Sequence, residues 1–265
     1  MNLAVVPSPE KAGPPPRSDE RLLIKIRAVQ KAFQLLDRVC AERTIGIAIA
    51  NPGVGKSYIL KAWRRKNQPR VRHIWIEAAI VLSPGPVLDA LVKALGIECD
   101  HKRMWKKLDA IAEAMARDPV LVVIDEADLL TVRGFEVLRS IWDRCAEILD
   151  TDGEAAFPLA LFGTRALRVK LAHPDLERLQ RRISEITELD PMDEGEMQMA
   201  LKSKWPGLRY DDDGFAVLHR LSRGSFGWLN KIVPIAAKLA AKDGGMVTAR
   251  IAGASRKYLL GLPEE

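Results

Sequence analysis

Hydrophobic residues along the chain fall into two patterns, short runs that are unbroken or interspersed with polar residues, and longer stretches with helical spacing. Five short runs predict β-strands at residues 44–49, 71–76, 120–124, 157–162 and 183–189. The run at 120–124 contains only large aliphatic residues, as in a central parallel strand that is covered on both faces. Helical spacing fills the intervals between the runs. Strands that alternate with helices predict an α/β fold with a parallel five-stranded sheet.

Apolar residues at helical spacing predict a long helix that starts at Arg21 and reaches Val39. Further helices are predicted at residues 57–66, 86–95, 101–117 and 135–149. Beyond Pro191 only helical patterns follow, at residues 194–205, 212–221, 226–242 and 247–260. We therefore divide the chain into a proline-rich flexible tail (1–20), an α/β domain (21–190) and a small all-helical lid with the C-terminal segment (191–265).

The composition is that of a soluble globular protein, with 48% apolar and 29% charged residues. Neither a membrane span nor a signal peptide is visible, and Cys40, Cys99 and Cys145 share no ligand-like spacing. We therefore expect a cytoplasmic protein with reduced thiols and no membrane partner. The formal net charge is +6, from 41 basic and 35 acidic residues. This excess favours a polyanionic partner only where the basic residues cluster.

A glycine-containing segment at residues 50–57, here called the phosphate loop, joins the first predicted strand to a helix. Its sequence, Ala-Asn-Pro-Gly-Val-Gly-Lys-Ser, departs from the strict phosphate-binding pattern only in Ala50, where the pattern has glycine. The alternative, a glycine turn with an incidental lysine, is disfavoured by the strand and helix on either side. We predict that the nucleotide contacts Asn51, Pro52, Gly53, Val54, Gly55, Lys56, Ser57 and Tyr58.

Two carboxylates, Asp125 and Glu126, follow the buried run at 120–124 and so lie at the carboxyl end of a strand, where α/β sheets bind ligands. With ATP as the nucleotide, Lys56 reaches the β- and γ-phosphates, while Ser57 and Asp125 hold Mg²⁺. Glu126 is the predicted base that activates the attacking water. Asp128 offers a third acid, although we favour its interpretation as a helix N-terminal or surface charge.

The order of these motifs resembles that of AAA+ ATPases, which implies a P-loop AAA+ nucleotide-binding domain with a helical lid. In such proteins a polar residue after a further buried strand contacts the γ-phosphate or the attacking water, and Thr164 matches that position, with a strand-end cap as the alternative. Arg181 and Arg182 match the position of an arginine finger, which acts on a neighbouring subunit in a ring or filament. We prefer Arg182 for this role, and a solvated basic helix end is the alternative.

Within this class the chain resembles the transposition-helper ATPases, the TniB and phage Mu B group. The resemblance rests on the compact length and on residues 124–130, 161–164 and 223–231. Gly227 stands where many AAA+ lids carry the sensor-2 arginine, for which Lys231 is a weak substitute. The missing arginine implies slow hydrolysis and a switch that responds to the bound nucleotide.

Basic residues cluster in two segments, and the resemblance implies that such residues line a channel around duplex DNA in a helical filament. The predicted DNA contacts are Lys61, Arg64, Arg65, Lys66, Arg70 and Arg72, followed by Lys102, Arg103, Lys106 and Lys107. For each cluster a solvated helix face is the alternative. Trp105 lies among the second group, where we expect it to anchor the helix in the core.

These expectations combine into an ATP- and Mg²⁺-dependent AAA+ protein that oligomerises on duplex DNA and recruits or activates a transposase or another recombination protein. One alternative is an ATPase of the ExeA type that is coupled to a protein partner and has no DNA role. A second is an adaptor that binds ATP but barely hydrolyses it. A replication initiator or helicase loader shares the same core, so this interpretation also stays open.

Overall fold

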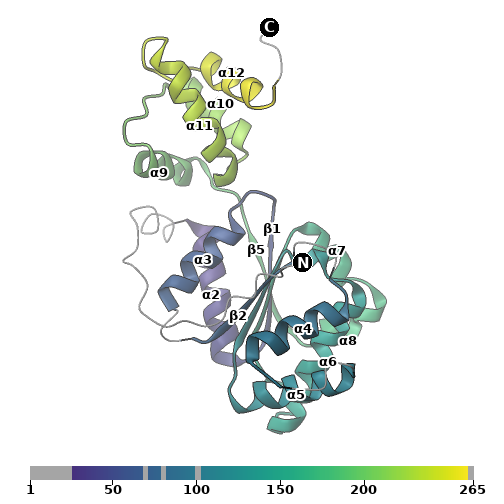
Figure 1. Ribbon diagram of the computed structural model, residues 1–265. Coiled ribbons are helices and arrows are strands. Elements are labelled where there is room, and N and C mark those ends of the chain that lie inside the picture. Colours follow the sequence, from purple (N-terminus) through teal and green to yellow (C-terminus); the bar gives the residue numbers. More distant parts are fainter. Residues whose placement is uncertain (1–25, 68–70, 79–81, 99–102, 262–265) are drawn as a thin grey trace. The chain divides into compact units, whose positions relative to one another are not determined.

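The computed structural model describes residues 26–67, 71–78, 82–98 and 103–261 (Figure 1). The predicted tail at residues 1–20 and the first residues of the helix expected from Arg21 lie outside these ranges. The described residues form two compact units, one of Lys31–Ala50 and Leu60–Glu188, the other of residues 26–30, Asn51–Ile59 and 189–261. The proposed domain boundaries at residues 20 and 190 stay a prediction.

Five parallel strands form one sheet in the order β2-β3-β4-β1-β5. Their bounds are β1 (Ile45–Ala50), β2 (His73–Glu77), β3 (Leu121–Asp125), β4 (Leu159–Gly163) and β5 (Ile183–Leu189). Ile49 pairs with Gly163 and Ile124 pairs with Leu161, so the carboxyl ends of β1, β4 and β3 lie at nearly the same level. The predicted α/β fold with a parallel five-stranded sheet is therefore confirmed.

Helices cover both faces of this sheet (Figure 1). One face carries α2 (Arg27–Glu42) and α3 (Lys56–Asn67), and the other carries α4 (Pro84–Leu95), α5 (Met104–Arg117), α6 (Val132–Leu149), α7 (Arg165–Leu171) and α8 (Glu177–Gln180). Strands β1, β3 and β4 are buried along their whole length, which explains their unbroken apolar sequences. At Gly46 a Cβ would lie 2.8 Å from the Leu35 side chain, so the missing side chain lets α2 approach β1 closely.

Differences between the predicted and observed helices have local causes. Helix α6 begins three residues before the predicted Phe135, because Thr131 Oγ1 accepts a hydrogen bond from Gly134 N at 3.0 Å and caps an earlier turn. Helices α7 and α8 and the 3₁₀ turn η2 (Pro174–Leu176) were not predicted, since they are too short to show helical periodicity. Another 3₁₀ turn, η1 (Ala127–Leu129), follows β3 directly.

Four helices, α9 (Glu194–Lys204), α10 (Asp212–Ser222), α11 (Phe226–Ala241) and α12 (Ala249–Leu259), make up the lid. Each begins at a residue whose side chain accepts a backbone N–H of the first turn: Asp193, Asp211, Ser225 and Thr248. Gly224 joins α10 to α11 with φ at 65°, and a Cβ there would lie 2.3 Å from Met192 O. The predicted small all-helical lid is confirmed.

Two of the three cysteines lie within the described ranges, and both are free thiols. Burial raises the pKa of Cys145 to about 11, and burial together with the charge of Asp37 raises the pKa of Cys40 to about 12. Both thiols are therefore protonated at neutral pH and react slowly. Cys99 lies outside the described residues. None of the helices that the structure describes is both long enough and apolar enough to cross a membrane.

Candidate functional site

The phosphate loop leaves the buried end of β1 and leads into the first turn of α3. Gly53 has φ at 87° and Gly55 has φ at 101°, values that other residues rarely adopt. Apart from its chain neighbours, no heavy atom of the described residues lies within 4 Å of the position that a Cβ on Gly55 would occupy. A glycine loop that has open space beside it and ends at a helix N-terminus suits the oxygens of a phosphate.

Lys56 and Ser57 occupy the first turn of α3. Lys56 is buried, although it carries a positive charge at the helix end where the dipole disfavours cations. The first turn of α3 contains no acidic residue. An anionic ligand at this helix end would therefore stabilise both the Lys56 ammonium group and the helix dipole. These features fit the predicted triphosphate, and the Ser57 hydroxyl supplies the oxygen donor that Mg²⁺ prefers.

The N-terminus of α11 contacts the phosphate loop at one carbonyl. Gly53 O accepts hydrogen bonds from Ser225 Oγ at 2.7 Å and from Gly227 N at 3.1 Å. A Cβ on Gly227 would lie 3.3 Å from that carbonyl oxygen, and a Cβ on Gly53 would lie 2.4 Å from Ser225 Oγ. The backbone of Gly227, at the position of the missing sensor-2 arginine, thus touches the loop directly. Sequence reasoning missed Ser225, although its place before a predicted helix marks an N-cap.

A narrow cavity of about 10 Å³ lies beside the loop in the same compact unit. Its apolar lining includes Ile26, Val29, Val54, Tyr58, Met192 and Phe226, and Asp190 contributes a carboxylate. The rings of Tyr58 and Phe226 are 6.3 Å apart between centroids and tilted by 49°. The cavity as it stands has room for about one water molecule, so a flat heterocyclic base would enter between these apolar walls only after the two rings separate. Val54, Gly55 and Tyr58 were predicted from the sequence as nucleotide contacts, whereas the lining by Ile26 and Val29 was not.

Arg27 ties the first turn of α2 to the start of α9, next to this cavity. Its backbone N donates to Glu196 Oε1 at 2.7 Å, and its guanidinium group contacts Asp193 Oδ2 at 2.7 Å. The hydrogen bond and charge of Glu196, with the charge of Asp193, raise the pKa of Arg27. Asp193 and Glu196 also form the capping box of α9. The sequence pattern Asp-x-x-Glu marks this box, but it does not reveal the basic partner.

Asp125 and Glu126 lie where β3 ends, at the same edge of the sheet as the end of β1. Asp125 is buried, and its Oδ1 accepts a hydrogen bond from Glu126 N at 3.0 Å. Glu126 adopts φ 55° and ψ 40°. This left-handed backbone conformation costs a residue that has a side chain about 1–2 kcal/mol. The strain turns the chain sharply out of the strand. Strained residues cluster at functional sites, which supports the predicted role of Glu126.

Thr164 follows β4, the strand between β1 and β3. Its backbone N donates to Asp128 Oδ1 at 2.9 Å, and its hydroxyl accepts from Ala166 N at 3.2 Å and so caps α7. A Cβ on Gly163 would lie 2.7 Å from Asp128 Oδ1, so glycine is needed here. Asp128 lies in the first turn of η1, in agreement with its favoured interpretation as a helix N-terminal charge, and its carboxylate also holds the backbone of Thr164. A contact between residues 36 apart leaves no local sequence signal.

Replacing Asp128 by alanine is expected to lower the free energy of unfolding by about 1–3 kcal/mol, since the Thr164 amide loses its acceptor. The rate of ATP turnover of this variant should also fall if Thr164 contacts the reacting phosphate. Urea denaturation and a turnover assay measure the two effects. Asp128→Asn, which keeps an acceptor oxygen, is the matched control and should retain most of the stability. Equal losses in both variants would show that the charge matters and that the hydrogen bond does not.

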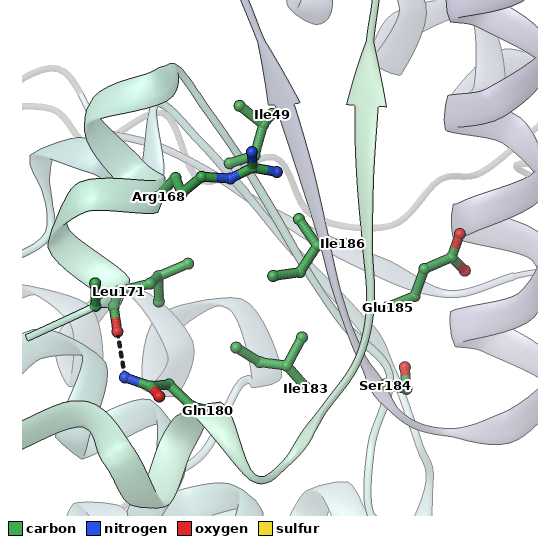
Figure 2. Close-up of a pocket in the computed structure, with 9 residues that line it drawn as sticks. Ile49, Arg168, Leu171, Gln180, Ile183, Ser184, Glu185 and Ile186 are labelled. Atoms are coloured by element: carbon green, nitrogen blue, oxygen red, sulfur yellow. Dashed lines mark hydrogen bonds between the residues drawn. The ribbon is translucent and has the colours of Figure 1, made fainter.

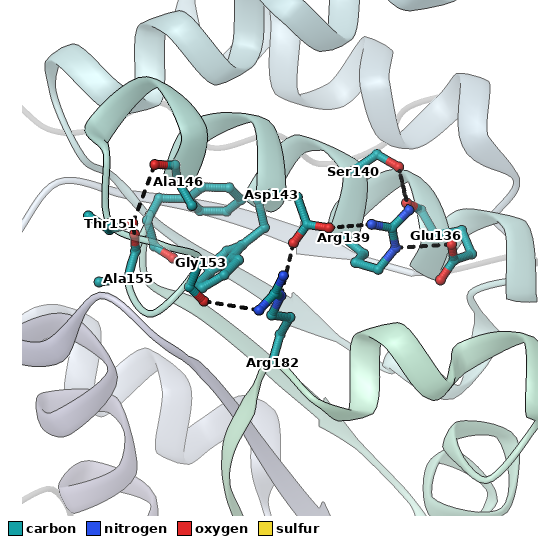
Figure 3. Close-up of polar contacts among 11 residues, drawn as sticks. Glu136, Arg139, Ser140, Asp143, Ala146, Thr151, Gly153, Ala155 and Arg182 are labelled. Atoms are coloured by element: carbon teal, nitrogen blue, oxygen red, sulfur yellow. Dashed lines mark hydrogen bonds and ion pairs between the residues drawn. The ribbon is translucent and has the colours of Figure 1, made fainter.

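The two arginines of the predicted finger differ in their surroundings. Arg182 Nε donates to Asp143 Oδ1 at 3.1 Å, and its Nη1 donates to Gly153 O at 3.4 Å (Figure 3). Its guanidinium group lies 6.0 Å from the centre of the Trp142 ring. The side chain of Arg181 is 72% exposed and pairs with Glu177 at 2.5 Å, within one helical turn. The Arg182 side chain is 36% exposed. Arg181 is thus the arginine that can reach a neighbouring subunit more easily.

The basic residues of the first predicted DNA cluster lie mainly on α3. Lys61, Arg65 and Lys66, here called the α3 basic face, are exposed, while Arg64 is half-buried. Helix α3 contains no acidic residue at all. Arg72, just before β2, is exposed but forms an ion pair with Asp118. Arg70 lies outside the described residues. The α3 basic face is therefore the part of this cluster that is best suited to contact phosphates.

The second cluster is divided by the start of α5. Arg103 is exposed and Lys106 is half-buried, whereas Lys107 is buried and forms an ion pair with Asp89. Its ion pair and its burial leave Lys107 poorly suited to the predicted contact with DNA. Trp105 is 59% exposed, so the expectation that it anchors the helix in the core was wrong. Lys102 lies outside the described residues.

A larger cavity of about 340 Å³ lies between α7 and β5 (Figure 2). Leu171, Ile183 and Ile186 line it together with Ile49 of β1, and Arg168 lies at its side. Gln180 Nε2 donates to Leu171 O at 2.7 Å across one end. None of the predicted site residues lines this cavity, so it is separate from the phosphate loop.

Comparison with solved structures shows where this fold recurs. The Orc1 protein of Aeropyrum pernix, in complex with DNA, matches 88% of this chain with a TM-score of 0.61 and 15% identity, and this chain spans 64% of its length. The match with Cdc6p of Pyrobaculum aerophilum covers 95% of this chain and 69% of the Cdc6p chain, with a TM-score of 0.62 and 16% identity. At these identities the likeness concerns the fold alone.

The match with a RuvB mutant of Thermotoga maritima covers 92% of this chain and 75% of the RuvB chain, with a TM-score of 0.57 and 15% identity. No curated protein matches the sequence. A model of the family described as "AAA domain" matches residues 40–171, a range that contains the phosphate loop, Asp125, Glu126 and Thr164. Residues 40–171 are thus similar to an AAA domain, and the parallel five-stranded sheet matches the P-loop AAA+ fold.

Proposed function

We propose that this chain binds and hydrolyses ATP and, in its ATP-bound form, assembles on duplex DNA, where it recruits or activates a transposase. One observation supports the proposal most directly. The phosphate loop continues β1, while Asp125 and Glu126 end β3 at the same edge of the sheet. This arrangement supplies a phosphate-binding loop, a carboxylate for a metal ion and a strained carboxylate as a base.

The residues present fit both ATP and Mg²⁺. Amides at the start of α3 and the Lys56 ammonium group would hold the phosphates, while the Ser57 hydroxyl and the Asp125 carboxylate would hold Mg²⁺ together with phosphate oxygens. Bound Mg²⁺ supplies positive charge that stabilises the transferring phosphoryl group. Glu126 orients a water molecule and accepts its proton. Gly227, in place of an arginine, leaves less charge near the γ-phosphate, so we expect slow turnover.

Duplex DNA as the partner is supported by the α3 basic face. Its three cations, Lys61, Arg65 and Lys66, lie on one helix without an acidic residue among them. Such side chains neutralise phosphates and do not read the base sequence. The Orc1 structure with DNA shows that a protein of this fold binds DNA, which is consistent with this choice. The transposase as the further partner rests on the lid sequence at residues 223–231.

Binding of a labelled duplex with ATP at low salt tests the proposal. Replacing Lys61, Arg65 and Lys66 by alanine is expected to weaken binding at least tenfold and to reduce the slope of log affinity against log salt by up to about 3. The matched control replaces three exposed lid lysines, Lys202, Lys238 and Lys242, and should leave the slope nearly unchanged. Failure of the wild-type protein to bind the duplex would rule out the DNA role and favour an ExeA-type protein partner.

Assembly on DNA is tested by electron microscopy with duplex DNA and a non-hydrolysable ATP analogue. We expect continuous helical filaments around the DNA, since a neighbouring subunit must supply the arginine finger at each ATP site. Discrete closed rings without DNA inside would contradict the filament. Filaments that do not stimulate strand transfer by any co-encoded transposase would favour the alternative of an initiator or helicase loader.

A further inference from the structure

Two large apolar side chains stand exposed at the start of α5. Met104 is 51% exposed and Trp105 is 59% exposed, and they follow each other in the first turn. Exposed tryptophan is unusual, because burial of this side chain gains more free energy than that of almost any other. Adjacent exposed apolar residues of this kind mark a surface that contacts a ligand or partner.

Basic residues flank these two side chains in the sequence. Arg103 precedes them and is exposed, and Lys106 Nζ lies 5.8 Å from the centre of the Trp105 ring. The first turn of α5, which the structure describes in full, holds no acidic residue. Asp109, one turn further along this face, pairs with Arg144 at 3.4 Å. We call Arg103, Met104, Trp105 and Lys106 the α5 patch.

The α5 patch is presented on a fixed part of the helix. Lys107, two residues after Trp105, is buried and forms an ion pair with Asp89 of α4, which holds the first turn of α5 against its neighbour. Leu108 packs against the main core from the next position. Rotation of the first turn to bury Trp105 would break both contacts. The exposed ring is thus a stable feature of the helix.

We propose that the α5 patch binds nucleobases that are exposed in DNA, with Trp105 stacking on a base and Arg103 and Lys106 contacting the adjacent phosphates. An aromatic ring flanked by cations matches the chemistry of an unpaired nucleotide, which presents an apolar flat face and a negative charge. Fully paired duplex hides the base faces and offers only the charge. The inference rests on the proposed function, since it takes DNA as the partner, and it adds that the protein distinguishes locally unpaired DNA from duplex.

The test compares two labelled DNA probes of equal length and charge, one fully paired and one with a central unpaired bubble, in the presence of ATP. Wild-type protein is expected to bind the bubble about tenfold more tightly, and Trp105→Ala should abolish this preference while leaving the affinity for the paired probe within twofold. Trp105→Phe should retain most of the preference, because it keeps an aromatic face. Tyr258→Ala is the matched control, since Tyr258 is an aromatic residue that is 66% exposed on α12.

Several outcomes would overturn the inference. Equal binding of the two probes by the wild-type protein would do so while leaving the proposed DNA role intact, whereas binding of neither probe would overturn both. An equal loss on both probes in Trp105→Ala would show a contact without base recognition. A change in the sedimentation of Trp105→Ala without DNA would identify a second copy of the chain as the occupant. Thermal unfolding of each variant checks that the fold is retained.

Discussion

Replacing Glu126 by glutamine is expected to lower the rate of ATP turnover by about a thousandfold while ATP binding persists. A general base contributes about 10²–10⁴ in rate, and glutamine cannot accept the proton of the attacking water. The amide has nearly the same size as the carboxylate, so the left-handed backbone of this residue and the hydrogen bond from its N–H to Asp125 should be retained. The variant should therefore stay in the ATP-bound state and remain assembled on DNA.

Steady-state phosphate release and the affinity for a fluorescent ATP analogue measure the two parts of this result. Glu113→Gln on α5, an exposed position, makes the same chemical change and is expected to leave turnover unaltered. Turnover that is equally close to zero in the wild-type protein and in Glu126→Gln would contradict the assignment. That outcome would instead favour an adaptor that binds ATP and scarcely hydrolyses it.

The second large effect is expected at Arg181, where alanine should reduce DNA-stimulated turnover by about a thousandfold without a loss of stability. Arginine fingers contribute about 10³–10⁵ in rate, and the exposed guanidinium group of Arg181 is available to a neighbouring subunit. Arg182→Ala should instead lower the melting temperature, because it removes the contacts with Asp143, Gly153 and the Trp142 ring. This pair of results would place the finger one residue before the position that the sequence favoured.

Mixed assemblies test whether the arginine acts on a neighbouring subunit. Arg181→Ala subunits keep an intact phosphate site, and Glu126→Gln subunits keep an intact finger. Each variant alone should be nearly inactive, whereas an equimolar mixture on DNA should recover a measurable fraction of wild-type turnover at interfaces of the right order. A mixture that stays as inactive as its components would show that Arg181 does not act in this way. If Arg182→Ala shows normal ATP turnover but a lower melting temperature, the finger is assigned to Arg181 and Arg182 has a structural role.

Most of the sheet was predictable because each strand carries its signal locally. Buried strands need apolar residues at consecutive positions, and the run at 120–124 follows this rule closely. Strand β5 instead mixes apolar with polar residues, as in a strand with one more exposed face. Helix boundaries were less predictable, since a cap such as Thr131 can extend α6 beyond its apolar pattern. Helices α7 and α8 have four to seven residues, which is too few for a period of 3.6 to repeat.

The phosphate loop was predictable for the same reason, since its glycines, lysine and serine are adjacent in the sequence. Contacts between distant segments were not. Ser225 meets Gly53 across 172 positions, and Arg27 meets Glu196 across 169, so only the folded chain brings them together. The expectation for Trp105 failed because helical spacing tells which residues share a face, but it does not tell whether that face is covered at the end of the helix.

The double hydrogen bond to the Gly53 carbonyl has a consequence for how long a nucleotide stays bound. Separation of α11 from the phosphate loop breaks the bonds from Ser225 and Gly227 together. Each hydrogen bond contributes about 1 kcal/mol net, so the two together favour the state in which α11 contacts the phosphate loop over the separated state by about 30 to 1. The residence time of a nucleotide whose base lies in the cavity beside the loop would then follow the rare openings of this contact. Ser225→Ala should shorten that residence time several-fold, which stopped-flow measurement of nucleotide release would record.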